Sequence, residues 1–155
     1  QQVKLTSNCY SEWGQVRSGV PQGTKLGPWL YILMINDLTT TRTKPWKFVD
    51  DTTLSEVVHK GKPSSIQEPV DEVQEWTRLS LAVLNEDKCK ELRIDFSWKQ
   101  TQTNHLDPIR VNGKEIEVVN HAKILGLTVS SDCKWKMHVD NIVFQASKRL
   151  YLITQ

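Results

Sequence analysis

Two aspartates, Asp50 and Asp51, stand side by side between apolar residues. Adjacent like charges disfavour each other's ionisation, so the pair needs a physical reason. One reason is a solvated turn, because aspartate accepts hydrogen bonds from nearby backbone N–H groups. The other is a hard-cation site, because Mg²⁺ binds through one or two carboxylates and keeps further positions for water and phosphate. The flanks Phe48, Val49 and Leu54 favour the second, since they predict a buried strand pair that holds the tip rigidly.

A loop rich in glycine and proline, SGVPQGTKLGP, occupies residues 18–28. Glycine allows a ligand to approach the backbone closely. Gln22, which lies between Pro21 and Gly23, carries an amide that donates and accepts hydrogen bonds. The residues alone leave two interpretations open, a binding surface and a plain connector to the helix that follows.

The spacing of apolar residues predicts three helices. Residues 28–36 are apolar nearly all round and begin with a proline that suits a first helical turn, so this helix is expected to be buried. Residues 66–84 repeat apolar side chains at helical spacing, and Ser65 and Glu68 are spaced as a capping box. A third helix is expected from residue 135 onward.

Alternation of apolar and polar residues predicts strands joined by short turns. Residues 46–58 are expected to form a hairpin with the two aspartates at its turn. Residues 109–119 carry a strong hairpin signal, because Asn112-Gly113 suits a type I′ turn. Single strands are expected at residues 3–5, 15–17, 89–98 and 122–131. This order favours an α+β domain, an antiparallel sheet with helices packed on one face.

Composition narrows the class of protein. The 155 residues suffice for one domain with a core, and the net charge of +2 is too small for a strongly basic nucleic-acid binder. The three cysteines are far apart and form no CxxC pair, which argues against a disulfide framework or a zinc site and for a reducing, intracellular compartment. No apolar run reaches the ~18 residues that span a membrane.

The motifs together resemble the polymerase core of reverse transcriptases, and they are most similar to LINE-type non-LTR retrotransposons. Residues 18–38 resemble motif B, and FVDD at residues 48–51 resembles the [FY]-x-D-D hairpin of motif C. LNEDKCKEL at residues 84–92 resembles motif D and puts Lys88 at its lysine. KILGLTVSSDCKW at residues 123–135 resembles the following Leu-Gly motif, the primer grip. The resemblance implies a partial right-hand palm over residues 1–131 and the start of a thumb helix over residues 132–155.

The resemblance also implies an activity, RNA-directed DNA synthesis by two-metal nucleotidyl transfer with Mg²⁺ or Mn²⁺. Asp50 would bind the catalytic ion and Asp51 would support it, so both would be metal ligands. The partners would be an RNA template, a DNA primer, deoxynucleoside triphosphates and an upstream part of the same polyprotein, with no membrane. Elements of this type prime synthesis at chromosomal nicks, which implies a nuclear location, although no basic import cluster is visible.

Further roles come from the resemblance position by position. Pro21, Gln22 and Gly23 would form the floor under the template base and the incoming nucleotide. Lys88 would lie near the triphosphate and protonate the leaving pyrophosphate. The alternative for Lys88 is an ordinary solvated charge.

The Leu-Gly pair and the tryptophan after it each have a second interpretation. Leu125 and Gly126 would hold the primer end, or they are plain strand core with a bulge. Trp135, between two lysines, would stack on a base or, more commonly for such an aromatic, pack at the start of its helix.

One part of the family pattern is missing from the given residues. The motif A aspartate would come from a strand before motif B, but residues 1–17 contain no aspartate, and Glu12 is their one carboxylate side chain. We therefore expect a fragment of a reverse transcriptase that is inactive by itself. Two alternatives are a non-catalytic nucleic-acid-binding remnant, whose salt-dependent binding would ignore Asp50→Ala, and a structural piece that folds only with an upstream partner.

Overall fold

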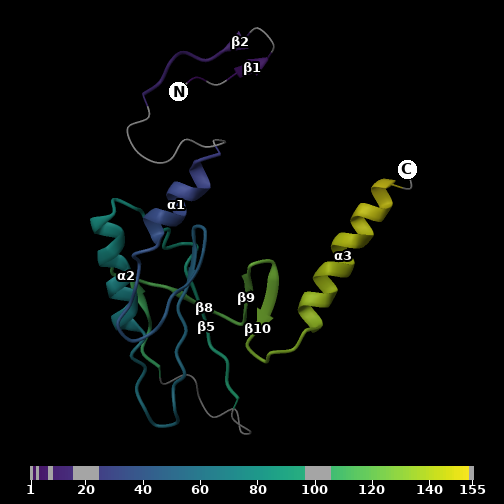
Figure 1. Cartoon of the computed structure of the whole chain (residues 1–155). Helices are drawn as coiled ribbons and strands as arrows, with labels where there is room; N and C mark the ends of the chain where they lie inside the picture. Colours follow the sequence, from purple (N-terminus) through teal and green to yellow (C-terminus); the bar gives the residue numbers. More distant parts are fainter. Residues whose placement is uncertain (1, 3, 7–8, 16–24, 97–105, 154–155) are drawn as a thin grey trace. The chain divides into compact units, whose positions relative to one another are not determined.

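The computed structural model describes residues 2, 4–6, 9–15, 25–96 and 106–153. The chain divides into two units, Gln1–Thr53 and Leu54–Gln155. Figure 1 shows the helices and strands in the order of the sequence.

The first unit contains two strand pairs and one helix. Strands β1 (Lys4–Thr6) and β2 (Cys9–Tyr10) pair antiparallel, as do β3 (Trp46–Phe48) and β4 (Asp51–Thr53), and helix α1 (Gly27–Ile35) precedes the second pair. The strand predicted at residues 3–5 is therefore nearly right. The one predicted at 15–17 is not seen at Gln15, and residues 16–17 lie outside the described residues.

Helix α1 begins where the sequence predicts, with Pro28 in its first turn. The expectation that it is buried is wrong, because Ile35 is its one buried residue and Leu33 is 71% exposed. The expected burial of the hairpin is also wrong, since Trp46 is 68% exposed and Phe48 is 59% exposed. A unit of this size supplies too little chain to cover an all-apolar helix and a strand pair on every side.

The second unit is built around helix α2 (Gln67–Leu79). Strand β5 (Lys90–Leu92) pairs parallel with β8 (Glu117–Val119), and the two run side by side in Figure 1. The hairpin β6 (Arg110–Val111) to β7 (Lys114–Glu115) and the hairpin β9 (His121–Ile124) to β10 (Leu127–Ser130) are antiparallel. Helix α3 (Lys136–Ile153) follows β10.

The buried apolar side chains in the described part of the second unit lie on α2 and in or directly before β6. Pro69 and Val73, four residues apart and therefore on one helix face, are buried, as are Ile109 and Val111. Two glutamines on α2 bind the backbone of the β6–β7 hairpin. The Gln67 amide donates to the Arg110 carbonyl oxygen at 2.9 Å and accepts from the Arg110 N–H at 2.8 Å, as a neighbouring strand would.

The ends of α2 differ from the prediction. The Ser65 hydroxyl forms no capping box and donates instead to Glu56 Oε1 at 2.6 Å. Partial burial alone would raise the pKa of Glu56, but hydrogen bonds from Ser64, Ser65 and Ile66 bring it below its ordinary value. The helix stops at Leu79 because Leu81 adopts φ 55°, and the Ala82 N–H donates back to the Thr77 carbonyl oxygen at 2.9 Å. This is a Schellman motif with leucine where glycine is usual.

Helix α3 is confirmed and is joined to β10 at its first turns. The Thr128 N–H donates to His138 Nδ1 at 3.2 Å, and the Asn141 amide donates to Thr128 Oγ1 at 3.4 Å. The Trp135 ring lies edge-on to the His138 ring, with centroids 5.8 Å apart, so Trp135 makes a packing contact. Among the described residues, no helix combines the length and the apolar character that crossing a membrane requires.

The described strands are paired two by two, four pairs antiparallel and one parallel. Within the described ranges these pairs do not join into one sheet. The single antiparallel sheet with helices on one face, the partial palm and the boundary at residues 131–132 therefore stay predictions.

Candidate functional site

The aspartate pair lies at a two-residue hairpin turn. Phe48 and Asp51 are directly opposite each other, and Val49 and Asp50 form the turn between them. Asp51 is therefore the first residue of β4 and not a turn residue as expected. Val49 has φ 52°, a conformation that costs a β-branched residue roughly 1–3 kcal/mol. Such backbone strain is concentrated at functional sites, and the two carboxylates that follow Val49 are exposed.

Lys47 attaches this hairpin to the C-terminal end of α1. Successive strand residues point to opposite faces, so Lys47 lies on the face opposite Phe48 and Asp51. Its Nζ donates to the carbonyl oxygens of Ile35, Asn36 and Leu38 at 2.8, 3.1 and 3.1 Å. The last carbonyls of a helix have no partner within the helix and favour a cation. The sequence motifs did not identify Lys47 as a site residue. The one sequence signal for it is a charged residue between two aromatic residues.

Tyr31 of α1 interacts electrostatically with Asp50 at the hairpin turn. Partial burial and the negative charge of Asp50 both raise the pKa of the Tyr31 phenol above its ordinary value. The helix and the aspartate pair therefore lie close enough to interact within the first unit. Tyr31 was not predicted as a site residue.

The donor set at the turn fits a hard divalent cation. Two adjacent carboxylates offer oxygen ligands of the kind that Mg²⁺ takes, and in the described part of the chain no lysine, arginine or histidine forms an ion pair with either of them. No group of three or more His, Cys, Asp or Glu side chains gathers as a metal site among the described residues. The pair can hold an ion only with further ligands from water, substrate or other protein.

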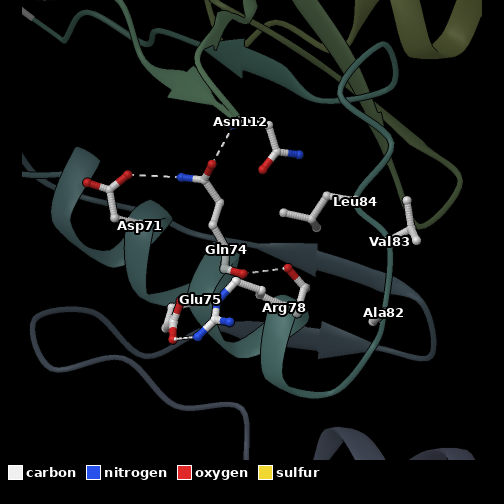
Figure 2. Close-up of a pocket in the computed structure, with 9 residues that line it drawn as sticks. Asp71, Gln74, Glu75, Arg78, Ala82, Val83, Leu84 and Asn112 are labelled. Carbon is white, nitrogen blue, oxygen red and sulfur yellow. Dashed lines mark hydrogen bonds and ion pairs between the residues drawn. The ribbon is translucent and has the colours of Figure 1, made fainter.

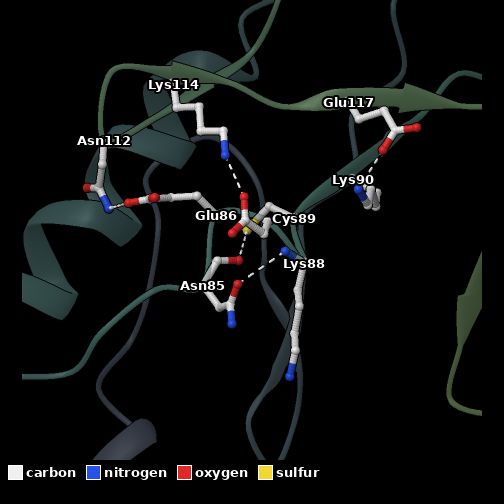
Figure 3. Close-up of polar contacts among 9 residues, drawn as sticks. Asn85, Glu86, Lys88, Cys89, Lys90, Asn112, Lys114 and Glu117 are labelled. Atoms are coloured by element: carbon white, nitrogen blue, oxygen red, sulfur yellow. Dashed lines mark hydrogen bonds and ion pairs between the residues drawn. The ribbon is translucent and has the colours of Figure 1, made fainter.

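Lys88 lies in a tight turn between α2 and β5. Its N–H donates to the Asn85 carbonyl oxygen at 3.1 Å, and the Cys89 N–H donates to the carbonyl oxygens of Asn85 and Glu86 at 3.3 and 3.1 Å. The Lys88 side chain is exposed, and Figure 3 shows it extending away from the polar contacts of the turn. A lysine presented in this way can meet an anion from solvent.

Leu125 and Gly126 form the turn of the β9–β10 hairpin. Ile124 and Leu127 pair directly across it, and the turn residues have φ 48° and 89°, both positive as in type I′ turns. The single strand expected over residues 122–131 and the alternative of strand core with a bulge are both wrong. A two-residue turn reverses the chain there.

We expect Gly126→Ala to lower the free energy of unfolding by about 1–2 kcal/mol, because an L-residue is strained at this φ. A Cβ at Gly126 would meet no atom within 4 Å, so the cost is conformational and not a clash. Urea unfolding followed by circular dichroism measures the change. Gly126→Asn is the control and should cost less, since asparagine tolerates this conformation. Equal losses for the two variants would contradict the strained turn.

Some predicted site residues are placed and others are not. Pro21, Gln22 and Gly23 lie outside the described residues. The structure brings Asp50 together with Asp51 in the first unit and makes Leu125 and Gly126 one turn in the second. Lys88 belongs to the second unit as well.

A pocket of about 430 Å³ opens beside α2, and no predicted site residue lines it. Figure 2 shows Gln74 at its centre, between Asp71 and Asn112. The Gln74 amide donates to Asp71 Oδ1 at 2.9 Å, and its oxygen accepts from the Asn112 N–H. The pocket wall therefore links α2 to the β6–β7 hairpin. Gln67 and Gln74 were missed as hairpin anchors, although their spacing of seven puts them on one face of the helix.

The chain is similar in sequence to the RNA-directed DNA polymerase from the mobile element jockey of Drosophila melanogaster. The two are 28% identical in an alignment over 141 residues, and the match covers 82% of this chain. The chain spans 14% of the length of that polymerase. No protein-family model matches the chain, and no solved structure does. The similarity supports a relationship to LINE-type reverse transcriptases.

Proposed function

We propose that the chain is part of an RNA-directed DNA polymerase of a LINE-type retrotransposon and carries the metal-binding hairpin of its palm. The observation that carries the proposal is the pair of exposed carboxylates at the strained turn, with no cationic partner in the described part of the chain. The similarity to the jockey polymerase supports the same assignment. The activity proposed is that of the complete polymerase.

Each group has a part in the proposed mechanism. Asp50 and Asp51 would hold Mg²⁺ or Mn²⁺, which when bound activates the primer hydroxyl and stabilises the charge on the phosphates. Lys47 keeps the hairpin against the end of α1, so the direction of the carboxylates depends on that anchor. Lys88 supplies a positive charge and a proton for the leaving pyrophosphate.

The remaining predicted residues would contact the nucleic acid. Pro21, Gln22 and Gly23 form the floor under the template base and the incoming nucleotide, and Leu125 with Gly126 holds the primer end. The partners are therefore an RNA template, a DNA primer and deoxynucleoside triphosphates. A third carboxylate comes from elsewhere in the complete polymerase, which acts in the nucleus.

Primer extension tests the proposal in two forms. The given chain by itself, supplied with an RNA template, a DNA primer, deoxynucleotides and Mg²⁺, should incorporate no nucleotide, since two carboxylates do not complete a two-metal site. A chimera in which the chain replaces the matching segment of the jockey polymerase should synthesise DNA on the RNA template. The chimera tests the family function, and the given chain tests the need for a third carboxylate.

The outcomes separate the alternatives. Asp50-dependent incorporation by the given chain would contradict its expected inactivity. Two results together would favour the non-catalytic binding remnant over the polymerase. The chimera would fold but be inactive, and the given chain would bind RNA in a salt-dependent way that Asp50→Ala does not change.

A further inference from the structure

The turn that carries Lys88 has an electrostatic difficulty. Glu86 and Asp87 come directly before Lys88. Two carboxylates beside a lysine repel an approaching phosphate and compete for the ammonium group. A phosphate-binding role for Lys88 is therefore favoured where other groups occupy these carboxylates.

The β6–β7 hairpin supplies those groups. The Asn112 amide donates to Glu86 Oε1 at 2.6 Å, and the Lys114 ammonium donates to Asp87 Oδ1 at 2.5 Å, contacts that Figure 3 shows. The hydrogen bond and charge of Lys114 lower the pKa of the Asp87 carboxyl, and Asp87 in turn raises the pKa of Lys114. Both shifts show that each group favours the charged form of the other.

The hairpin is itself held in place by α2. Asn112 and Gly113, at φ 50° and 79°, form the predicted type I′ turn, and the Asn112 N–H is bound by Gln74 of α2. The chain that follows the hairpin is bound in turn, because β8 pairs with β5 and Lys90 Nζ lies 2.6 Å from Glu117 Oε2. The hairpin that carries the partners of Glu86 and Asp87 is therefore bound to α2 through Gln74.

Lys88 is left with a different environment. In the described part of the second unit, no carboxylate forms an ion pair with its ammonium group. Its side chain points away from the Glu86 and Lys114 contacts in Figure 3. In this turn the Lys88 ammonium group is thus available to a ligand, whereas the Glu86 and Asp87 carboxylates each already accept a hydrogen bond.

We infer that Asn112 and Lys114 are positioning residues that occupy Glu86 and Asp87 and so leave Lys88 available to a triphosphate. The inference rests on the proposed function, in which Lys88 meets the triphosphate of the incoming nucleotide. Asn112 and Lys114 act through the turn and need no contact with the ligand.

Binding of inorganic tripolyphosphate to the given chain, followed by NMR chemical shifts, tests the inference. Lys88→Met should abolish the binding. Lys114→Met should weaken it up to about fivefold, in line with the strength of exposed ion pairs, because Asp87 then faces the ligand and Lys88. Adding Asp87→Asn to Lys114→Met should restore the affinity. Lys62→Met, an equal charge change in the loop before α2, should have no effect.

The variants distinguish a failure of the proposed phosphate role of Lys88 from a failure of the inference about its neighbours. If Lys88→Met binds as tightly as the unsubstituted chain, the phosphate role of Lys88 fails, and the inference fails with it. If Lys88→Met loses binding but Lys114→Met does not, the inference alone is overturned. A loss in Lys114→Met that Asp87→Asn does not restore would show a merely structural contact. Should Lys114→Met fail to fold, Asp87→Asn alone decides, because it should bind at least as tightly as the unsubstituted chain.

Discussion

Asp50→Ala is expected to lower RNA-templated DNA synthesis by the chimeric polymerase about a thousandfold or more. A metal ion at the reacting phosphate contributes several kcal/mol of transition-state stabilisation, and each 1.36 kcal/mol is about tenfold in rate. Asp50 is exposed at the turn, so its removal leaves little packing to disturb. Primer extension with purified chimeras at saturating deoxynucleotide measures the rate.

The control separates loss of the ion from loss of charge. Asp107→Ala removes an exposed carboxylate outside any helix or strand and should leave the rate unchanged. Mn²⁺ titration of the given chain by electron paramagnetic resonance gives a second readout, in which Asp50→Ala should abolish the weak binding expected of the Asp50-Asp51 pair. An Asp50→Ala chimera within tenfold of the parent would exclude this aspartate as the catalytic ligand.

Lys47→Met is expected to lower the free energy of unfolding by about 1–3 kcal/mol, the range for leaving buried polar groups without their partner. The substitution keeps the length of the side chain but removes three hydrogen bonds from the end of α1, two of them part-buried. Hydrogen exchange should report the loss locally, because the amides of α1 would open more often. Urea unfolding gives the global value.

Lys47→Arg is the matched control, since a guanidinium also donates several hydrogen bonds. It should retain most of the stability and slow the exchange of α1 relative to Lys47→Met. In the chimera, Lys47→Met should also reduce synthesis, because the hairpin that carries Asp50 and Asp51 loses its attachment to the helix. Unchanged exchange in α1 after Lys47→Met would show that the three contacts do not hold the helix end.

Local chemistry was enough to predict the backbone conformation wherever one residue type restricts it. Pro28 marks the start of α1, and the Asn112-Gly113 pair forms the expected type I′ turn, because both are consequences of backbone sterics at those residues. The paired aspartates were correctly assigned to a hairpin, with Asp51 one residue beyond the turn. The resemblance to mobile-element polymerases also came from the sequence, and the similarity to the jockey polymerase supports it, while the individual motif assignments stay predictions.

Only the tertiary structure decided the features that depend on contacts between distant segments. Leu81 adopts positive φ with no glycine beside it, so α2 ends earlier than predicted. Leu125 also adopts positive φ, directly before Gly126, and the predicted strand becomes a hairpin. Lys47 and Gln74 bind backbone groups 9–12 and 38 residues away, and strand β5 pairs in parallel with a segment 27 residues on. The residue type determines which hydrogen bonds a side chain can form, but the fold determines its partner. Each side chain binds the backbone group that packing brings within reach.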